Sequence, residues 1–364
     1  MNKRILLFLI MLVSISSLAQ ESKRPIQISF AYPLSTNGIN AKNTSNTLSY
    51  NIIYGKNGGV RGFELGGVLN ENHGNVSGAQ YAGVSNMTYG SSNGLVLSGV
   101  YNMITGNASG MHFTGVYNQF NKKASGIQIS GVLNMTGGNS SGLAFSGVAN
   151  LYRSDYKGLQ FSVVNINNGT INGMQMGVVN KTKKLKGLQI GIVNIADNAD
   201  DGACLGLINL VKKNRYSAFE VSFNESAFLD VTYKLGTHKL YTLYRLGSTF
   251  YDNSFVIAKG LGLGSRVYNK DKYSIYVEAS SSDIDTDFKA NETINLHSKL
   301  CANVQYKISE KYSLQAGVSF NAYYTEEMND NKFKSFNMPY TLSENISSNS
   351  ATYTWIGANI GIVF

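Results

Sequence analysis

The chain has few prolines and cysteines, and it has no long apolar run after its first twenty residues. Among 364 residues there are three prolines and two cysteines, Cys204 and Cys301. Disulfide-stabilised secreted scaffolds use many more cysteines, so we expect both thiols to be unpaired. No later apolar run approaches the roughly 20 residues of a membrane-spanning helix, so any membrane insertion must use β-strands. The 38 glycines, 23 tyrosines and 17 phenylalanines favour an all-β chain with many turns.

Residues 1–19 are typical of a secretory signal peptide. Lys3 and Arg4 precede an apolar stretch over residues 5–13, and small residues lead to a predicted cut after Ala19. Because no cysteine lies near this cut, we do not expect a lipid anchor on an N-terminal cysteine. A secreted chain that can enter a membrane only by strands predicts the outer membrane of a Gram-negative envelope.

Positive charge exceeds negative charge along the chain. The formal charge is +9, and removal of Lys3 and Arg4 with the signal peptide lowers it to +7. Part of the excess lies in two clusters, Lys181–Lys186 and Lys212–Arg215. Such clusters bind anionic headgroups or polyanions, but they also serve as solvated turns that protect strand edges. We expect outer-membrane lipid as a partner and no nucleic acid.

Glycine and asparagine recur in step through the middle of the chain. The spacing is sixteen residues at first and fourteen or fifteen later, which gives ten copies of one supersecondary unit. The glycines are Gly62, Gly78, Gly94, Gly110, Gly126, Gly142, Gly158, Gly173, Gly187 and Gly202. The asparagines are Asn70, Asn86, Asn102, Asn118, Asn134, Asn150, Asn165, Asn180, Asn194 and Asn209.

Each copy has the pattern of one β-solenoid coil. In residues 126–134 a short alternating strand is followed by a corner at Gly131 and Val132 and then by Asn134. We expect Ile129 to face the interior and Gln128 to face outward. Stacked coils bring equivalent residues together, which predicts a structural asparagine ladder. The alternative is that each copy is one barrel strand with its turn.

Longer alternating segments follow the repeats and predict an antiparallel transmembrane β-barrel. The clearest segments are residues 296–308 and 312–324, and eight such strands occur between residues 215 and 364. Residues 26–32 and 47–54 alternate in the same way and would raise the count to about ten. We therefore predict N-terminal barrel strands over residues 20–56, the solenoid over 57–214, and the rest of the barrel over 215–364. A soluble antiparallel sandwich is the alternative.

The alternation of the barrel strands assigns six charged residues to the lumen. These residues are Asp230, Lys234, Arg245, Glu278, Lys299 and Lys307. With about ten strands the interior is narrow enough for side chains to fill it, so we expect a plugged lumen. Phe364 ends an alternating strand, which resembles the terminal signature by which outer-membrane barrels are recognised for assembly.

The sequence contains no pattern for catalysis, cofactors or metals. The four histidines, His73, His112, His238 and His297, have no metal-ligand spacing. The glycines of Gly260–Gly264 lie inside an alternating strand instead of between a strand and a helix, so they do not predict a phosphate loop. No Gly-x-Ser-x-Gly nucleophile elbow occurs in a strand-to-helix context. We predict no catalytic, cofactor-binding or metal-binding residue, and no enzyme activity.

The signal peptide, the Gly-x-Gln-x-small-Gly-Val-x-Asn copies and the C-terminal strands resemble a family of bacterial surface-repeat proteins whose function is not established. The resemblance implies an envelope location and transfers no catalytic residue. We expect a non-enzymatic surface protein in which the barrel anchors and the repeats form a scaffold or bind an envelope polymer or protein. A narrow outer-membrane channel is the alternative, and an envelope hydrolase is a more distant one. Strand parity, with the repeats after two barrel strands, predicts that they face the periplasm.

Overall fold

We analysed a computed structural model of the chain, which describes residues 22–251, 254–285, 293–329, 332–333 and 340–364. The predicted signal peptide lies outside these residues. The described chain is almost entirely β-strand, as predicted, and its one helical segment is the short 3-10 helix η1 (Gly38–Asn43). No helix in this part of the chain has the length and apolarity to cross a membrane. The chain divides into two compact units, residues 1–177 and 178–364.

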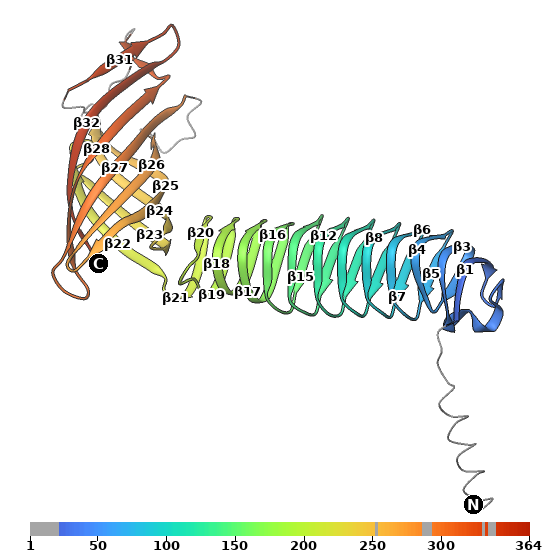
Figure 1. Cartoon of the computed structure of the whole chain (residues 1–364). Helices are drawn as coiled ribbons and strands as arrows, with labels where there is room; N and C mark the ends of the chain where they lie inside the picture. The colour runs from blue at the N-terminus through green and yellow to red at the C-terminus, as the bar shows by residue number, and fades with distance from the viewer. Residues whose placement is uncertain (1–21, 252–253, 286–292, 330–331, 334–339) are drawn as a thin grey trace, which may run out of the picture. The chain divides into compact units, whose positions relative to one another are not determined.

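The first unit is a stack of parallel coils, each made of a longer and a shorter strand (Figure 1). Strand β12 pairs in parallel with β10 and β14, and each residue lies beside the one sixteen positions away. The longer strands are β4 (Gly59–Gly66), β6 (Val76–Ala82), β8 (Ser92–Ser98), β10 (Ala108–Thr114), β12 (Ala124–Ser130), β14 (Ser140–Ser146) and β16 (Tyr156–Phe161). The shorter ones are β5 (Leu69–Asn72), β7 (Ser85–Thr88), β9 (Tyr101–Ile104), β11 (Tyr117–Phe120), β13 (Leu133–Thr136) and β15 (Ala149–Tyr152), and β17 (Val164–Met176) covers both positions.

The recurring glycine of each coil is required by its backbone. Gly126 has a φ of 106°, and a Cβ there would lie 2.0 Å from the carbonyl oxygen of Gly110 in the coil before. The same conformation recurs at the equivalent glycines from Gly78 to Gly173. A side chain at this row would be strained and would separate the coils, which explains why the row is glycine in every copy.

The two N-terminal segments assigned to the barrel belong to the solenoid. Strand β1 (Ser22–Ala31) pairs in parallel with β3 (Thr44–Asn57), and β3 pairs in parallel with β4 and β5. The prediction was wrong because a period of two identifies a half-buried strand without saying whether its neighbour is parallel or antiparallel. The short strand β2 (Leu34–Ser35) pairs with β1 at this end. Parallel pairing between successive copies also excludes the alternative of one barrel strand per copy.

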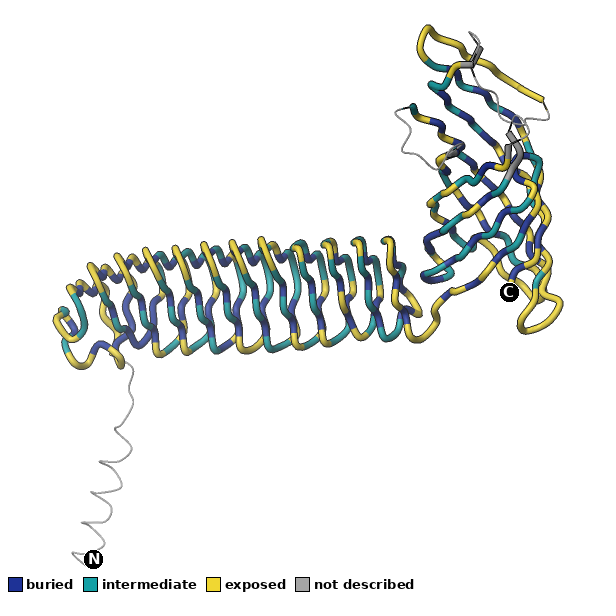
Figure 2. The backbone as a smooth tube through the Cα atoms, turned by 180° about the vertical axis from the view of Figure 1, so that it is seen from behind, coloured by how far each residue is buried: buried dark blue, intermediate teal, exposed yellow. Residues whose placement is uncertain are grey.

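The predicted inner and outer faces of the coil are reversed. Gln128 is completely buried, whereas Ile127 and Ile129 on either side of it face outward and are half-buried. The corner residue Val132 is 40% exposed. Figure 2 shows the alternation along each coil and the exposed segments at the edges of the stack. The interior therefore combines buried amides such as Gln128 with apolar residues such as the cluster of Ile104, Ala108, Phe120 and Ala124, while the apolar rows on either side of Gln128 face outward.

The second unit contains further coils followed by a closed barrel. The coil strands are β18 (Val179–Ile190), β19 (Val193–Asn198), β20 (Ala203–Leu205) and β21 (Ile208–Lys213). The barrel consists of eight antiparallel strands, β22 (Tyr216–Asn224), β23 (Leu229–Thr237), β24 (Leu240–Tyr251), β25 (Ser254–Lys270), β26 (Tyr273–Asp285), β27 (Asn295–Lys307), β28 (Ser313–Thr325) and β32 (Ala351–Val363). Pairing of β22 with β32 closes it. The predicted count of ten is two too high because β1 and β3 lie elsewhere.

Three shorter strands lie beyond the barrel wall. Strand β31 (Ser343–Ile346) pairs with the beginning of β32, and β29 (Met328–Asn329) pairs with β30 (Lys332–Phe333). At the other end of β32, the backbones of Phe364 and Phe219 exchange hydrogen bonds of 2.7 and 3.2 Å. The predicted terminal residue thus takes part in the seam that closes the barrel.

The barrel strands alternate between an apolar outer face and a polar inner face, as their sequence predicts. On β27, Leu296, Leu300 and Val304 are exposed, whereas His297 and Lys299 are buried. The same alternation on β28 exposes Val318 and Phe320. The barrel interior is therefore more polar than its surface, which is the reverse of a soluble sandwich.

Candidate functional site

The predicted asparagine row forms a hydrogen-bonded ladder inside the coils. In the first unit each side-chain Nδ2 donates to the Oδ1 of the next asparagine, at 2.8 to 3.1 Å, from Asn51 through Asn165. In the second unit Asn180, Asn194 and Asn209 continue in the same way at 2.9 Å. The second Nδ2 hydrogen goes to a backbone carbonyl, as from Asn134 to Phe145 at 2.8 Å. All ten predicted asparagines are buried, and Asn51 adds a member that the glycine spacing did not reveal.

The ladder of the second unit ends on the barrel. Nδ2 of Asn209 donates to Oγ1 of Thr242 on β24 at 3.1 Å, and this hydroxyl donates to the carbonyl of Gly206 at 2.5 Å. The last amide therefore has partners although no further coil follows it. Because the side-chain amide of Asn209 is paired in this way, the end of the ladder offers no free amide donor to another chain.

A buried carboxylate lies near the start of the first unit. Glu64 on β4 is fully buried and accepts hydrogen bonds from four side-chain amides. Asn57 and Asn51 donate to Oε1 at 2.6 and 3.2 Å, and Asn72 and Gln80 donate to Oε2 at 2.6 and 2.9 Å. Burial raises the pKa of Glu64 to about 7, although the four amides favour the ionised form. Sequence analysis missed this residue, because it occupies the row that we expected to face outward.

The same inner row contains a histidine in a later coil. His112 takes the place of Gln80 and Gln128, packs edge-on against Phe120 with ring centroids 5.0 Å apart, and is fully buried. Neither ring nitrogen has a hydrogen-bond partner among the described residues. Burial lowers the pKa of His112 to about 4, so the ring is neutral near pH 7.

Glu64 and His112 should give different coils opposite responses to pH. The pKa of Glu64 is raised above 4.5 in the folded chain, so its stabilising contribution is complete below pH 4.5 and is lost as the pH rises towards 7. The pKa of His112 is lowered from 6.5, so its contribution is complete above pH 6.5 and is lost as the pH falls towards 4. Hydrogen exchange, corrected for the intrinsic rate, should therefore become faster with rising pH near β4 and with falling pH near β10. We expect each effect to reach a few kcal/mol.

Glu64→Gln and His112→Gln should each remove the local pH dependence of their own coil and leave the other unchanged. Glu71→Gln is the matched control, because hydrogen bonding by Tyr54 and the charge of Lys56 lower the pKa of Glu71 despite its partial burial. The pKa of Glu71 thus moves in the opposite direction to that of Glu64. If the pH dependence near β4 survived in Glu64→Gln, the assignment to Glu64 would be incorrect.

Five of the six predicted lumen charges lie inside the barrel, where four of them form ion pairs. Nζ of Lys234 lies 2.6 Å from Glu220 and 2.5 Å from Glu278, and its side chain is fully buried. Arg245 pairs with Asp230 and donates to Oγ of Ser280 at 2.6 Å. Lys299 is also buried and lies beside these residues around a small cavity.

Further hydrogen bonds surround the carboxylates of this network. Glu278 accepts from the Tyr241 hydroxyl at 2.7 Å and from Asn303 at 3.0 Å, and Glu220 accepts from Gln315 at 2.8 Å. We missed Glu220, although its position between Ala218 and Ser222 on one face of an alternating strand was a readable signal. Lys307 is a wrong prediction, since it is exposed and pairs with Glu310 at 2.7 Å. It lies at the end of β27, where the alternation of the strand no longer applies.

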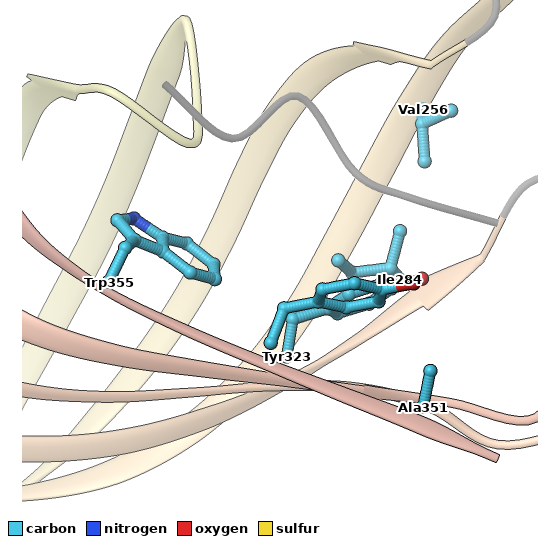
Figure 3. Packing of buried hydrophobic residues seen from close by; sticks show 6 residues of the cluster. Val256, Ile284, Tyr323, Ala351 and Trp355 are labelled. Carbon is cyan, nitrogen blue, oxygen red and sulfur yellow. The ribbon is translucent and has the colours of Figure 1, made fainter. Parts of the chain in front are cut away.

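Aromatic clusters close the lumen on both sides of the charges. One cluster consists of Val256, Ile284, Tyr323, Ala351, Tyr353 and Trp355, and Figure 3 shows Trp355 and Tyr323 projecting into the space that the strands enclose. The other consists of Tyr216, Ala218, Tyr241, Leu243, Tyr276 and Val363. Between them the cavity beside Lys299 has a volume of about 20 Å³. A cavity of this size holds about one water molecule, so side chains fill the described lumen beside the charged network.

A loop carboxylate strengthens the first of these plugs. Glu225, between β22 and β23, accepts hydrogen bonds from the indole Nε1 of Trp355 at 3.0 Å and from Asn321 at 3.1 Å. Its other oxygen accepts from the backbone of Ala358 at 3.0 Å. His297 stacks on Trp355 with ring centroids 5.3 Å apart and contacts Asn321 at 3.1 Å.

The other reactive groups are dispersed. His73 pairs with Glu71 on the coil surface, and His238 packs against Tyr216 in the barrel. Cys204 and Cys301 are both free and buried, as predicted. Nowhere in the described ranges do three or more histidine, cysteine, aspartate or glutamate residues form a group that could hold a metal ion.

Comparison of the chain with protein-family models, curated proteins and solved structures finds no match.

Proposed function

We propose that the chain is a non-enzymatic outer-membrane protein of a Gram-negative bacterium, exported by its signal peptide. The barrel is its anchor, and the repeats are a scaffold or binding surface in the envelope. The observation that carries the anchor is the inversion of the barrel, which has ion pairs inside and leucine, valine, isoleucine and phenylalanine outside. Lipid is the solvent that favours this distribution, because it leaves no water outside to solvate polar groups.

The plugged lumen favours an anchor over a channel. A pore that conducts ions needs a continuous polar path, and here aromatic clusters border a cavity of about 20 Å³. The proposed family relationship to bacterial surface-repeat proteins agrees with an envelope location.

Because β1 and β3 are not barrel strands, the proposed periplasmic position of the repeats follows from the order and the turns of the eight barrel strands. The eight barrel strands all follow the repeats, and an even number of strands returns Phe364 to the barrel end at which Tyr216 enters. The turns at this end are short, with two residues between β23 and β24 and two between β25 and β26. Short turns face the periplasm in outer-membrane barrels, so the repeats would enter from that side.

The anchor predicts a folded barrel in the outer membrane without steady conductance. The protein should fractionate with outer membranes, migrate faster in gels when it is not heated, and show no stable open level in planar bilayers. Recovery of the mature chain as a monomer without detergent would contradict the anchor. A steady open level whose anion preference falls in Lys299→Gln would favour the channel instead.

A further inference from the structure

The coils of the first unit carry a continuous apolar surface that their own fold does not cover. The corner row consists of Val68, Val84, Val100, Val116, Val132, Val148 and Val163, which are 39 to 51% exposed. Two outward rows on the longer strands lie beside it. They contain Phe63, Ala79, Leu95, Met111, Ile127, Leu143, Leu159 and Met174, and Leu65, Tyr81, Leu97, Phe113, Ile129, Phe145, Phe161 and Met176. No member of these three rows is charged.

The three rows together form a large apolar surface. At about 4.8 Å per coil the corner row is roughly 29 Å long, and the six residues from Ile127 to Val132 span at most about 17 Å. One side of the corner therefore presents on the order of 500 Å² of apolar surface, near the upper limit for a soluble monomer. The shorter strands add further apolar residues, such as Leu133 and Met135, on the other side of the corner.

The surface also contains an elongated groove. It crosses five coils beside the corner and is lined by the outward side chains Leu65, Tyr81, Leu97, Phe113 and Ile129 and by corner glycines. Its volume is about 710 Å³. A long, open, apolar groove that follows the coil axis has the form of an acyl chain and offers few polar groups to a peptide backbone.

The charged residues of the first unit lie outside the three apolar rows. The turns that follow the shorter strands contain Lys122 and Lys123 in one coil and Arg153 with Asp155 in another, and Lys157 lies at the start of β16. Lys122 and Lys123 are exposed. The outside of the coil is thus amphipathic around its axis, with the apolar corner separated from polar turns, two of which carry basic residues that suit anionic headgroups.

We propose that the first unit lies in one leaflet of a bilayer, with the corner row among the acyl chains and the basic turns at the headgroups. The apolar depth of at most about 17 Å is close to half of a hydrocarbon core of about 30 Å. The amide interior is compatible with this position because its ladder hydrogen bonds are internal to the coils. The inference rests on the proposed function to the extent that the barrel brings the coils to a membrane.

Spin labels on the full chain test this position. Cys204 and Cys301 are first replaced by alanine, and single cysteines are then introduced as Val132→Cys, Lys123→Cys and Leu300→Cys. Val132 and Lys123 belong to the same coil, and Leu300 reports on the outer face of the barrel. The protein is reconstituted in vesicles of phosphatidylethanolamine and phosphatidylglycerol. Relaxation by oxygen, which concentrates in lipid, is compared with relaxation by a water-soluble nickel chelate.

We expect the ratio of oxygen to nickel accessibility to be several-fold higher at Val132 than at Lys123, and to approach the ratio at Leu300. A lipid signal at Leu300 with a water signal at Val132 would overturn the inference and leave the barrel anchor intact. A water signal at both positions would overturn both proposals. Low accessibility to both reagents at Val132, with a short label-to-label distance between protomers, would assign the face to a second copy and overturn the lipid assignment.

Discussion

Replacement of Asn134 by leucine should lower the free energy of unfolding of the first unit by about 2 to 6 kcal/mol. The change removes the acceptor for Asn118 and the donor to both Asn150 and the carbonyl of Phe145, whose hydrogen bonds with Asn134 are 2.8 to 3.0 Å long. Oδ1 of Asn150 keeps a hydrogen bond from Ser146 at 3.1 Å, whereas an N–H of Asn118 and the carbonyl of Phe145 each lose one, at about 1 to 3 kcal/mol per group. Denaturant unfolding, followed by hydrogen exchange at β11, β13 and β15, measures the loss.

Asn107→Leu is the control for this substitution. Asn107 is an exposed turn asparagine of the same repeat and does not belong to the ladder, so its replacement should change the stability by less than about 0.5 kcal/mol. Equal effects at positions 107 and 134 would show that the ladder contributes no more than a surface amide.

Replacement of Lys234 by methionine should destabilise the barrel by about 3 to 5 kcal/mol. The ammonium lies between Glu220 and Glu278, and its removal leaves two carboxylates buried without their cation. The temperature at which the unheated gel form converts to the heated form should fall accordingly. The triple variant Lys234→Met, Glu220→Gln, Glu278→Gln should recover most of the loss, because it removes the whole ion-pair network.

Lys307→Met tests whether the effect depends on position. Lys307 is an exposed lysine whose partner Glu310 is almost fully exposed, so the expected change is close to zero. A triple variant as unstable as Lys234→Met would indicate that lost packing of the lysine stem, and not unpaired charge, causes the destabilisation.

Much of the architecture could be predicted because the residues that define it recur at regular spacings along the sequence. The spacing of Asn118, Asn134 and Asn150 predicts stacked coils, since only stacking brings residues sixteen apart into contact in every copy. The alternation on β27 and β28 predicts a barrel with a polar inside. In these regions the local pattern and the tertiary contacts agree.

The wrong predictions concern segments whose local pattern fits two different tertiary environments. Residues 26–32 and 47–54 alternate like barrel strands, but the parallel pairing of β1 with β3 places them at the start of the solenoid. Lys307 has the inward position in the alternation of β27, but it is the last residue of the strand and its side chain is exposed. Glu64 was missed because it is recognisable as buried only from the amides around it. Glu220 was missed although the alternation of β22 places it on the same face as Ala218 and Ser222.

The sequence by itself determined the length of the coil, ten of the ladder asparagines and the alternation of the barrel strands, because each is a repeat along the chain. The coil that contains β1 and β3 and the ladder residue Asn51 came only from the structure. Only the tertiary structure decided which face of the coil is inside. An alternation of Ile127, Gln128 and Ile129 defines two faces, and hydrophobicity assigns the apolar face to the interior when the solvent is water. Here amides bond from coil to coil and share the interior with apolar residues such as Ile104 and Phe120. The apolar rows of Ile127 and Ile129 remain on the outside, where their environment depends on what surrounds the coils.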